Sequence, residues 1–319
     1  MEVSNNSLLN ILLPNQNAVL KEALKSADNN ELKNLLQNKN LSSQEILKSI
    51  FEQIKNPDKS NQSLLNMLKN SSLLKDIGSF SSNISDLTTS LKNDSNLKSF
   101  ANTLENFTKN IKDINPNNLE QNIKNSGIFL ESKLANISNI TNMANLDNKN
   151  IIDDLKTILL KTNEEAIKSN PEVSKQIDKL LVQIETSQMY SLLSNSNYVY
   201  IPFLWENLED GNLELKKSET EDFYCKINLT LKNFGKVEIT LGVFNNIDFE
   251  IYANFENENL KTLFKKKIAT LKEGFTNQEI NLKVLRINDL NENDKSKSTY
   301  EKNTYDEYSS ILKQVDIKV

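Results

Sequence analysis

Alternation of apolar and polar side chains over residues 222–241 is the feature that most constrains the fold of this chain. Successive side chains of a strand point to opposite faces, so alternation gives a strand one apolar face and one solvated face. Two alternating runs, residues 223–231 and 237–241, are separated by a short connection that contains Gly235. Because Gly adopts a positive φ without strain, as tight turns require, the pattern predicts a β-hairpin.

The sequence after the hairpin completes an α+β unit. A third alternating run, residues 247–253, follows an Asn-Asn turn. The period then becomes helical between Asn257, an expected cap, and Gly274, where a left-handed stop is expected. Residues 280–284 return to strand spacing. We therefore expect an α+β fold, with a helical amino-terminal region followed by a small antiparallel sheet and one packed helix, in the core order β-β-β-α-β.

A lead-in hairpin is expected just before this unit. Residues 198–205 form an aromatic run that contains Pro202, which indicates an edge position or a strand end because Pro has no N–H to donate. Asp210 and Gly211 are expected to turn the chain into the next strand.

Helical spacing dominates the sequence upstream. Residues 20–114 predict short helices broken by Asn and Ser, and apolar side chains at 97, 100, 104, 107 and 111 form a stripe typical of intramolecular packing. Residues 119–193 predict a helical hairpin or small bundle, with Pro171 opening its last helix. Gly127 within this pattern marks a close helix contact or a break. The expected organisation is residues 1–18, a flexible export signal or a frayed terminus; 19–115, a marginal helical, ruler-like region; 116–195, the hairpin or bundle; 196–290, the α+β domain; and 291–319, a mobile tail with an apolar tip.

The residue types present exclude several kinds of site. The chain has no His, which removes Ser-His-Asp and Cys-His catalysis and imidazole metal ligands. Its one Cys, Cys225, occupies an inward strand position, so we expect a buried core thiol. The six Gly residues are too dispersed to cradle a phosphate. We expect no cofactor and no metal site.

Paired carboxylates are the remaining catalytic candidates. Asp153 with Asp154 and Glu164 with Glu165 are adjacent on helical segments, so the members of each pair diverge. Asp248 and Glu250 share the outward face of a strand, where a solvated carboxylate keeps an ordinary pKa and makes a poor acid or base. These pairs are expected to be solvated surface, so we expect no catalytic residues and no enzyme.

Charge and hydropathy limit the partners. The net charge of -5 argues against a nucleic-acid binder, because phosphate contacts require clustered Lys and Arg. The one basic triplet, residues 265–267, is expected to be a solvated helix face. No stretch has the length of a membrane span, and no basic residue precedes the apolar residues near the start, so we expect neither membrane insertion nor a cleaved signal peptide. We expect a monomer.

Several stretches resemble flagellar hook-length control proteins, above all their carboxy-terminal domain. The resemblance extends over residues 120–290 and rests on the order of the motifs along the chain. It is carried by Ser126–Leu134; by Ile184, Glu185 and Gln188; by Ile201, Pro202 and Phe203; and by Leu231, Gly235, Val237, Ile239, Leu241, Phe249, Leu260, Leu271 and Gly274.

The resemblance implies a protein that is made in the cytoplasm and exported through the flagellar secretion apparatus during hook assembly. In that family the amino-terminal part measures hook length, and the carboxy-terminal domain switches export specificity by contacting the cytoplasmic domain of the export gate. Hook and hook-cap subunits are the other implied partners. Many members have Pro-rich or low-complexity amino-terminal parts, whereas this chain has five Pro and a mostly amphipathic pattern. The alternative is a non-secreted cytoplasmic helical adaptor or export chaperone.

The expected switch surface combines the hairpin turn with the tail tip. The tip alternates around an acidic residue, as the family pattern does, and it can dock on its own sheet or on a partner. The expected partner-binding residues are Asn233, Phe234, Gly235, Lys236, Val237, Val315, Asp316, Ile317 and Val319.

Overall fold

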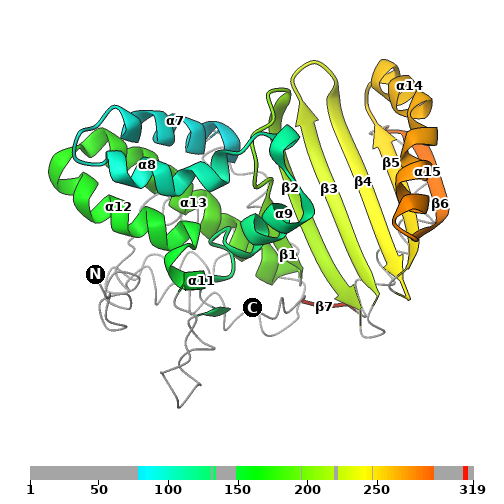
Figure 1. The fold of residues 1–319 in the computed structure, drawn as a ribbon, viewed down its shortest axis with the longest axis horizontal. Helices are drawn as coiled ribbons and strands as arrows, with labels where there is room; N and C mark the ends of the chain where they lie inside the picture. The colour runs from blue at the N-terminus through cyan, green and yellow to red at the C-terminus, as the bar shows by residue number, and fades with distance from the viewer. Residues whose placement is uncertain are drawn as a thin grey trace, which may run out of the picture. The chain divides into compact units, whose positions relative to one another are not determined.

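The computed structural model describes residues 78–130, 132–133, 149–194, 196–218, 222–245, 247–290 and 312–314. They divide into two compact units (Figure 1). Unit 1 holds the helices up to Ser194 together with residues 202–204, and unit 2 holds the remaining described residues from 196 onward. The expected α+β class is confirmed, because helices precede a sheet whose strands are not interleaved with them until its last crossover.

Unit 1 is built from helices of 3 to 24 residues, several of which begin at a polar cap. Asn115 and Asn118 cap one helix reciprocally, each side-chain oxygen accepting from the other residue's backbone N–H at 3.0 and 2.8 Å. Pro116 is the first residue of that helix, where its missing N–H costs nothing. The helices in the described ranges of this unit are α7 (Phe80–Lys92), α8 (Lys98–Leu104), η1 (Glu105–Thr108), η2 (Ile111–Asp113), α9 (Pro116–Lys124), α11 (Lys149–Ile152), α12 (Leu155–Ser169) and α13 (Pro171–Ser194).

The core of unit 1 lies among α7, α8, α12 and α13. Helix α7 packs against α13, α8 packs against α7 and α12, and α12 packs against α13. Fully buried Leu and Ile side chains come from all four helices, so residues 80–104 share one core with residues 155–194. The expected boundary at residue 115 therefore falls inside this unit. The side chains that fill the core include Ile84, Leu87, Leu91, Leu97, Leu104, Leu155, Leu159 and Ile177.

Residues 202–204 are bound into unit 1 by polar contacts. The backbone N–H of Leu204 donates to the carbonyl of Lys109, and the N–H of Ile111 donates to the carbonyl of Leu204, both at 2.8 Å. The buried Asn122 side chain donates to the carbonyl of Pro202 at 3.0 Å. The aromatic run at 198–205 is thus not one strand: its strand ends at residue 200, before the Pro that cannot donate to a ladder.

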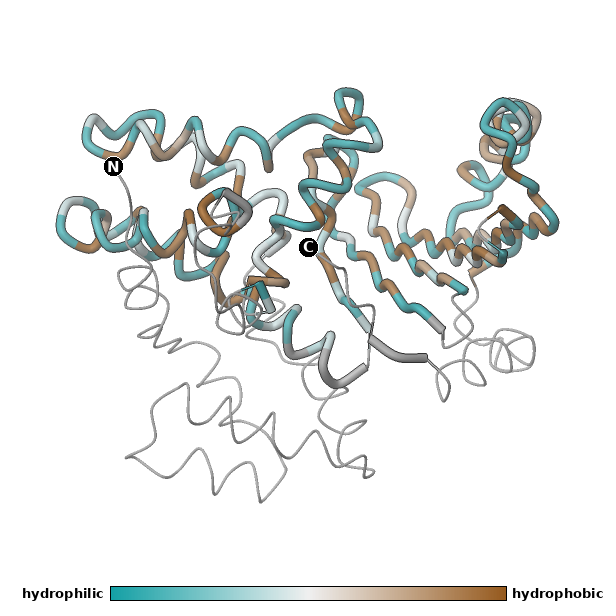
Figure 2. Tube along the Cα trace, turned by 60° about the horizontal axis from the view of Figure 1, so that its bottom comes forward, coloured by the Kyte–Doolittle hydropathy of each residue, from teal (hydrophilic) through white to brown (hydrophobic). Residues whose placement is uncertain are grey.

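Unit 2 is a sheet in the order β1-β2-β3-β4-β5-β6. Neighbouring strands from β1 to β5 are antiparallel, and β7 adds to part of β2. Apolar and polar residues alternate along these strands (Figure 2). The strands are β1 (Asn197–Tyr200), β2 (Leu208–Ser218), β3 (Phe223–Leu231), β4 (Gly235–Phe244), β5 (Asp248–Phe255), β6 (Asn281–Asp289) and β7 (Leu312–Gln314).

The last strand of the core corrects the expectation of a purely antiparallel sheet. Strand β6 runs parallel to β5. The physical reason is the connection, because a crossover through helices returns the chain to the same end of the sheet, whereas a short hairpin reverses it. The sheet is therefore mixed.

Two helices, not one, form that crossover: α14 (Glu258–Lys266) and α15 (Ile268–Asn277). Asn257 caps α14 as expected, accepting from the N–H of Leu260 at 3.1 Å. The expected stop at Gly274 is wrong, because Gly274 lies inside α15 and a left-handed residue, Glu279 with φ +58°, follows the helix instead. The helices contact the sheet through the ring pairs Phe264–Phe255 and Phe275–Phe249.

The expected turn at Asp210 and Gly211 is also wrong, since both residues lie inside β2. A Cβ at position 211 would lie 2.9 Å from Cγ1 of Ile201 and 3.1 Å from the carbonyl oxygen of Asn228. Gly is needed there for close packing and not for a turn.

No helix within the described ranges combines the length and apolar character that crossing a membrane requires.

Candidate functional site

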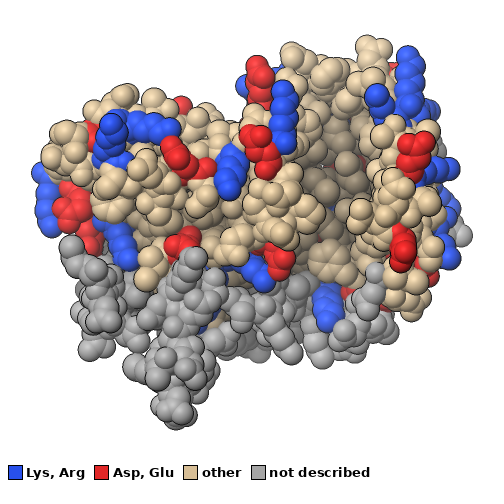
Figure 3. All heavy atoms as spheres, viewed as in Figure 1, with Lys and Arg blue, Asp and Glu red and all other residues tan. Residues whose placement is uncertain are grey.

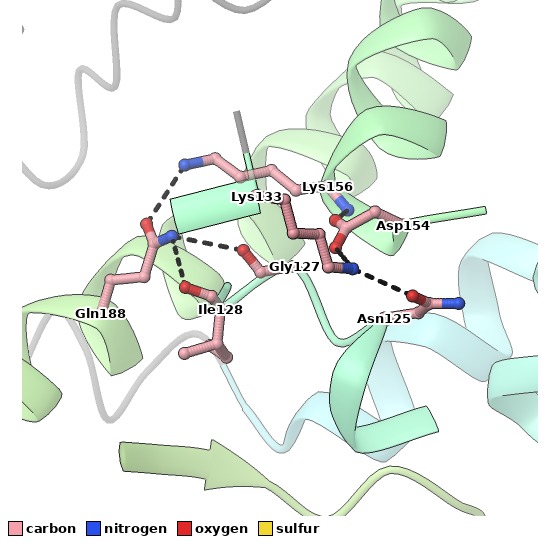
Figure 4. A network of polar contacts seen from close by, with 7 residues as sticks. All are labelled: Asn125, Gly127, Ile128, Lys133, Asp154, Lys156 and Gln188. Carbon is pink, nitrogen blue, oxygen red and sulfur yellow. Dashed lines mark hydrogen bonds and ion pairs between the residues drawn. The ribbon is translucent and has the colours of Figure 1, made fainter. Parts of the chain in front are cut away.

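A buried polar network in unit 1 joins two of the stretches that carry the family resemblance (Figure 4). It forms where the loop after α9 passes between the start of α12 and the middle of α13. Gly127 in this loop has φ +86°, and a Cβ there would lie 3.0 Å from Cβ of Lys156 and 3.1 Å from Cδ1 of Ile184. Both the backbone conformation and the available space therefore require Gly. The expectation of a break or close contact at this position is confirmed.

Gln188 on α13 holds this loop in place. Its Nε2 donates to the carbonyl oxygens of Gly127 at 3.2 Å and of Ile128 at 3.1 Å. Its Oε1 accepts from Nζ of Lys156 at 3.1 Å. Lys156 also lies 3.8 Å from the Glu185 carboxylate, with both side chains less than a tenth exposed. One amide thus satisfies two loop carbonyls that no helix or strand would satisfy.

A fully buried ion pair forms the other half of the network. Nζ of Lys133 donates to Oδ2 of Asp154 and to Oδ1 of Asn125, both at 2.9 Å. The other carboxylate oxygen, Oδ1 of Asp154, accepts from the backbone N–H of Lys156 at 3.0 Å and so caps α12. Charges removed from water in this way are stable only when they are paired and hydrogen-bonded.

The position of Asp154 corrects the expectation that the adjacent carboxylate pairs are solvated. Asp154 is 0% exposed, whereas Glu164 and Glu165 lie exposed on α12 as expected. The sequence signal was an Asp directly before an apolar helical run, which is an N-cap pattern. A capping carboxylate is drawn to the helix end, and here the helix end is buried.

The geometry of this network suits holding the loop, α12 and α13 in position better than it suits catalysis. The Lys133 ammonium is held by a carboxylate and the Asp154 carboxylate by an ammonium and a backbone N–H, so neither offers a free base or nucleophile. Within the described ranges, no three or more Cys, Asp or Glu side chains are grouped as metal ligands would be. The loop, α12 and α13 are thereby locked as one body.

The expected switch surface at the hairpin turn has a defined geometry of its own. Gly235 has φ +66°, as the pattern predicted, and a Cβ there would collide with the Glu256 carboxylate. That carboxylate accepts from the backbone N–H of Lys236 at 2.6 Å. Asn233 and Lys236 are exposed and Phe234 is half-buried. A charged hydrogen bond from the end of β5 therefore fixes the turn in one conformation.

Not every expected partner-binding residue can take that role. Val237 is only 4% exposed, so it supports the turn from the core and presents no surface. Val315, Asp316, Ile317 and Val319 lie outside the described residues. Just before them, β7 pairs with β2 from residue 216 to residue 218, so this part of the tail adds to its own sheet.

The outward carboxylate Asp248 needs a second correction. Asn281 donates a side-chain hydrogen bond to it at 3.0 Å and Lys283 lies 3.4 Å away, and these contacts lower its pKa from the ordinary value. A carboxylate with a lowered pKa is an even weaker base than a free one.

Burial raises the pKa of the Cys225 thiol to about 12, consistent with the buried thiol that was expected.

Comparison with known proteins found no match among family models, curated proteins or solved structures.

Proposed function

We propose that this chain is a flagellar hook-length control protein that is exported during hook assembly and switches export specificity through unit 2. The observation that carries the proposal is the order of the two units, since the resemblance requires a helical part followed by an α+β head, and the chain has both in that order. The cytoplasmic domain of the export gate is the proposed partner of the head. Hook and hook-cap subunits are the proposed partners during export.

The direct contact between two of the stretches that carry the resemblance also supports the proposal. Ser126–Leu134 and the Ile184–Gln188 stretch are about 50 residues apart in the sequence, yet Gln188 binds the backbone of Gly127 and Ile128. Direct contact between the two stretches is what a shared structural role would produce.

The fold also constrains how such a protein would measure length. The helices of unit 1 in the described ranges are separate and packed on a common core, so they do not form one continuous rod. A chain extends to about 3.3–3.6 Å per residue only when it is unfolded. We propose that measurement occurs with unit 1 unfolded in the export channel, and that the core reforms outside it.

Two measurements test the proposal in the organism that encodes the chain. Deleting the gene should give overlong hooks without filaments, and restoring it should give hooks of normal length. The intact protein should also appear in the culture medium only when the flagellar export gate is functional. Normal hooks in the deletion strain, or a protein that stays in the cell, would reject the proposal; retention with impaired export of another substrate would favour the adaptor or chaperone.

A further inference from the structure

Gly274 occupies a position in α15 that the fold does not require to be Gly. It lies seven residues into a ten-residue helix, its φ is not positive, and apart from the adjacent residues and the backbone of its own helix no atom lies within 4 Å of where a Cβ would be. Gly in a helix interior costs about 1 kcal/mol relative to Ala. At Gly127, Gly211 and Gly235 the structure supplies a steric or conformational reason, but here it supplies none.

Gly274 lines an apolar hollow of about 580 Å³ on the surface of unit 2. Its lining is mainly apolar, with Lys267, Thr270 and Gln278 also at its wall, and it adjoins a smaller, more polar hollow near Lys272 and Lys283. No residue of α15 is buried, although its apolar side chains recur at helical spacing. The side chains that line the apolar hollow include Phe264, Ile268, Leu271, Phe275 and Ile280.

Lysines are frequent on the elements that form this hollow: Lys267 lines it, and Lys272 and Lys283 line the adjoining one. Residues 258–283 contain six Lys and three Glu, in a chain whose net charge is -5. Lys261 and Lys283 are paired with Asp289 and Asp248. The other four, residues 265–267 and 272, form no ion pair within 4 Å of a described carboxylate, although Lys265 is close enough to Asp289 to help lower its pKa. Figure 3 shows Lys side chains projecting along α14 and α15, with acidic side chains set among them.

We infer that this hollow receives an apolar side chain from an acidic amphipathic segment of a partner protein, with carboxylates of that segment contacting the lysines. Apolar side chains seated in a pocket, with charges at its rim, are the usual anchors of such recognition. A hollow of about 580 Å³ can admit an apolar side chain of a partner, and Lys267 in its lining can meet a carboxylate of the same segment. The absence of a side chain at Gly274 keeps the hollow open.

The test uses a matched pair of substitutions at one position. Gly274→Ala and Gly274→Leu both raise helix propensity, but only Leu carries a side chain long enough to occupy the hollow. The probe is a fluorescent acidic peptide of about four helical turns, with Leu and Phe on one face and Glu on the other. Its binding to the full chain is followed by fluorescence anisotropy, and thermal unfolding checks that each variant is folded.

Binding should be unchanged in Gly274→Ala and weaker by roughly tenfold or more in Gly274→Leu, since one apolar anchor is lost. Reversing the charge of Lys266, Lys267 and Lys272 should also weaken binding, and added salt should reduce the contribution of these lysines. The inference is overturned if the peptide does not bind, if Gly274→Leu binds as the natural chain does, or if only vesicles of phosphatidylglycerol bind. It stands without the proposed function, because peptide binding in solution and hook length are measured separately.

Discussion

Lys133 and Asp154 form an ion pair of 2.9 Å in which the two side chains are 3% and 0% exposed. They are 21 residues apart, and the pair ties Lys133, which follows the loop after α9, to the N-terminus of α12. A pair this buried contributes less to net stability than its geometry suggests, because both charges have left water. Its main effect is to favour a single packing arrangement, because either charge would be buried without a partner if the two were separated.

Removing one partner should therefore cost more than removing both. Lys133→Met leaves the Asp154 carboxylate buried without its ammonium, and we expect unit 1 to lose about 3–5 kcal/mol in free energy of unfolding. The double variant Lys133→Met with Asp154→Leu should recover a large part of that loss. Urea unfolding followed by circular dichroism measures both.

The control for this experiment is an exposed pair on the same unit. Lys175 and Glu172 lie 3.3 Å apart with side chains 71% and 74% exposed, and Lys175→Met should change stability by less than about 1 kcal/mol. Equal effects of Lys133→Met and Lys175→Met would show that the buried pair does not have the role described.

Two Gly-to-Ala substitutions should have effects of opposite sign. Gly127→Ala forces a Cβ into a left-handed backbone position 3.0 Å from Cβ of Lys156, and should destabilise unit 1 by about 1–3 kcal/mol. Gly274→Ala meets no atom and should stabilise α15 by about 0.5–1 kcal/mol. Amide hydrogen exchange in each unit separates the two effects, and destabilisation by Gly274→Ala would contradict the open space at that position.

Much of unit 2 could be predicted because its signals are local. Alternation fixes which face of a strand is apolar, and the conformation of Gly235 follows from the turn between two alternating runs. The direction of β6 could not be predicted in the same way, because it depends on a crossover that α14 and α15 build by packing on the sheet. Gly211 was misread for a related reason: its role depends on contact with Ile201 and Asn228, which local sequence does not reveal.

The sequence indicated some residues of the polar network but not the contacts between them. Gln188 and Lys133 belong to the stretches that carry the resemblance, which indicates their positions but no physical role. Asp154 was misassigned because an acidic pair on a helical segment is usually solvated. What decides its burial is the contact between α12 and a loop that precedes it by more than 20 residues, and no periodic pattern records that contact.

Cys225 should be unreactive in the native protein. Burial raises its pKa to about 12, so at pH 8 the thiolate fraction is on the order of one part in ten thousand. Because the folded pKa exceeds the unfolded one, the associated stability is full below the unfolded value of about 8.5 and falls as pH rises toward 12. Reaction with a thiol reagent should be slow in buffer and fast in urea, and rapid stoichiometric labelling of the native chain would contradict this burial.

Acid should weaken the contact between α14 and β6. Lys261 lowers the pKa of Asp289 through a direct hydrogen bond and ion pair. Since the folded pKa lies below the unfolded value of about 3.9, the stability from this contact is complete above that value and is lost as pH falls through the lowered folded pKa. Thermal unfolding between neutral pH and strong acid should show this loss, and Asp289→Asn should reduce it. Glu273→Gln, which removes one negative charge from the exposed side of α15, is the control.

Gly235→Val is the substitution that links the hairpin turn to the proposed switch. A branched side chain at φ +66° is strained by about 1–3 kcal/mol, and its Cβ would displace the Glu256 carboxylate from the N–H of Lys236. We expect faster amide exchange in the turn and, if the turn contacts the export gate, overlong hooks. Glu256→Ala separates the two causes, because it removes the hydrogen bond without straining the backbone and should give a milder defect of the same kind. A Gly235→Val protein that has an altered turn yet supports hooks of normal length would show that the switch surface lies elsewhere on unit 2.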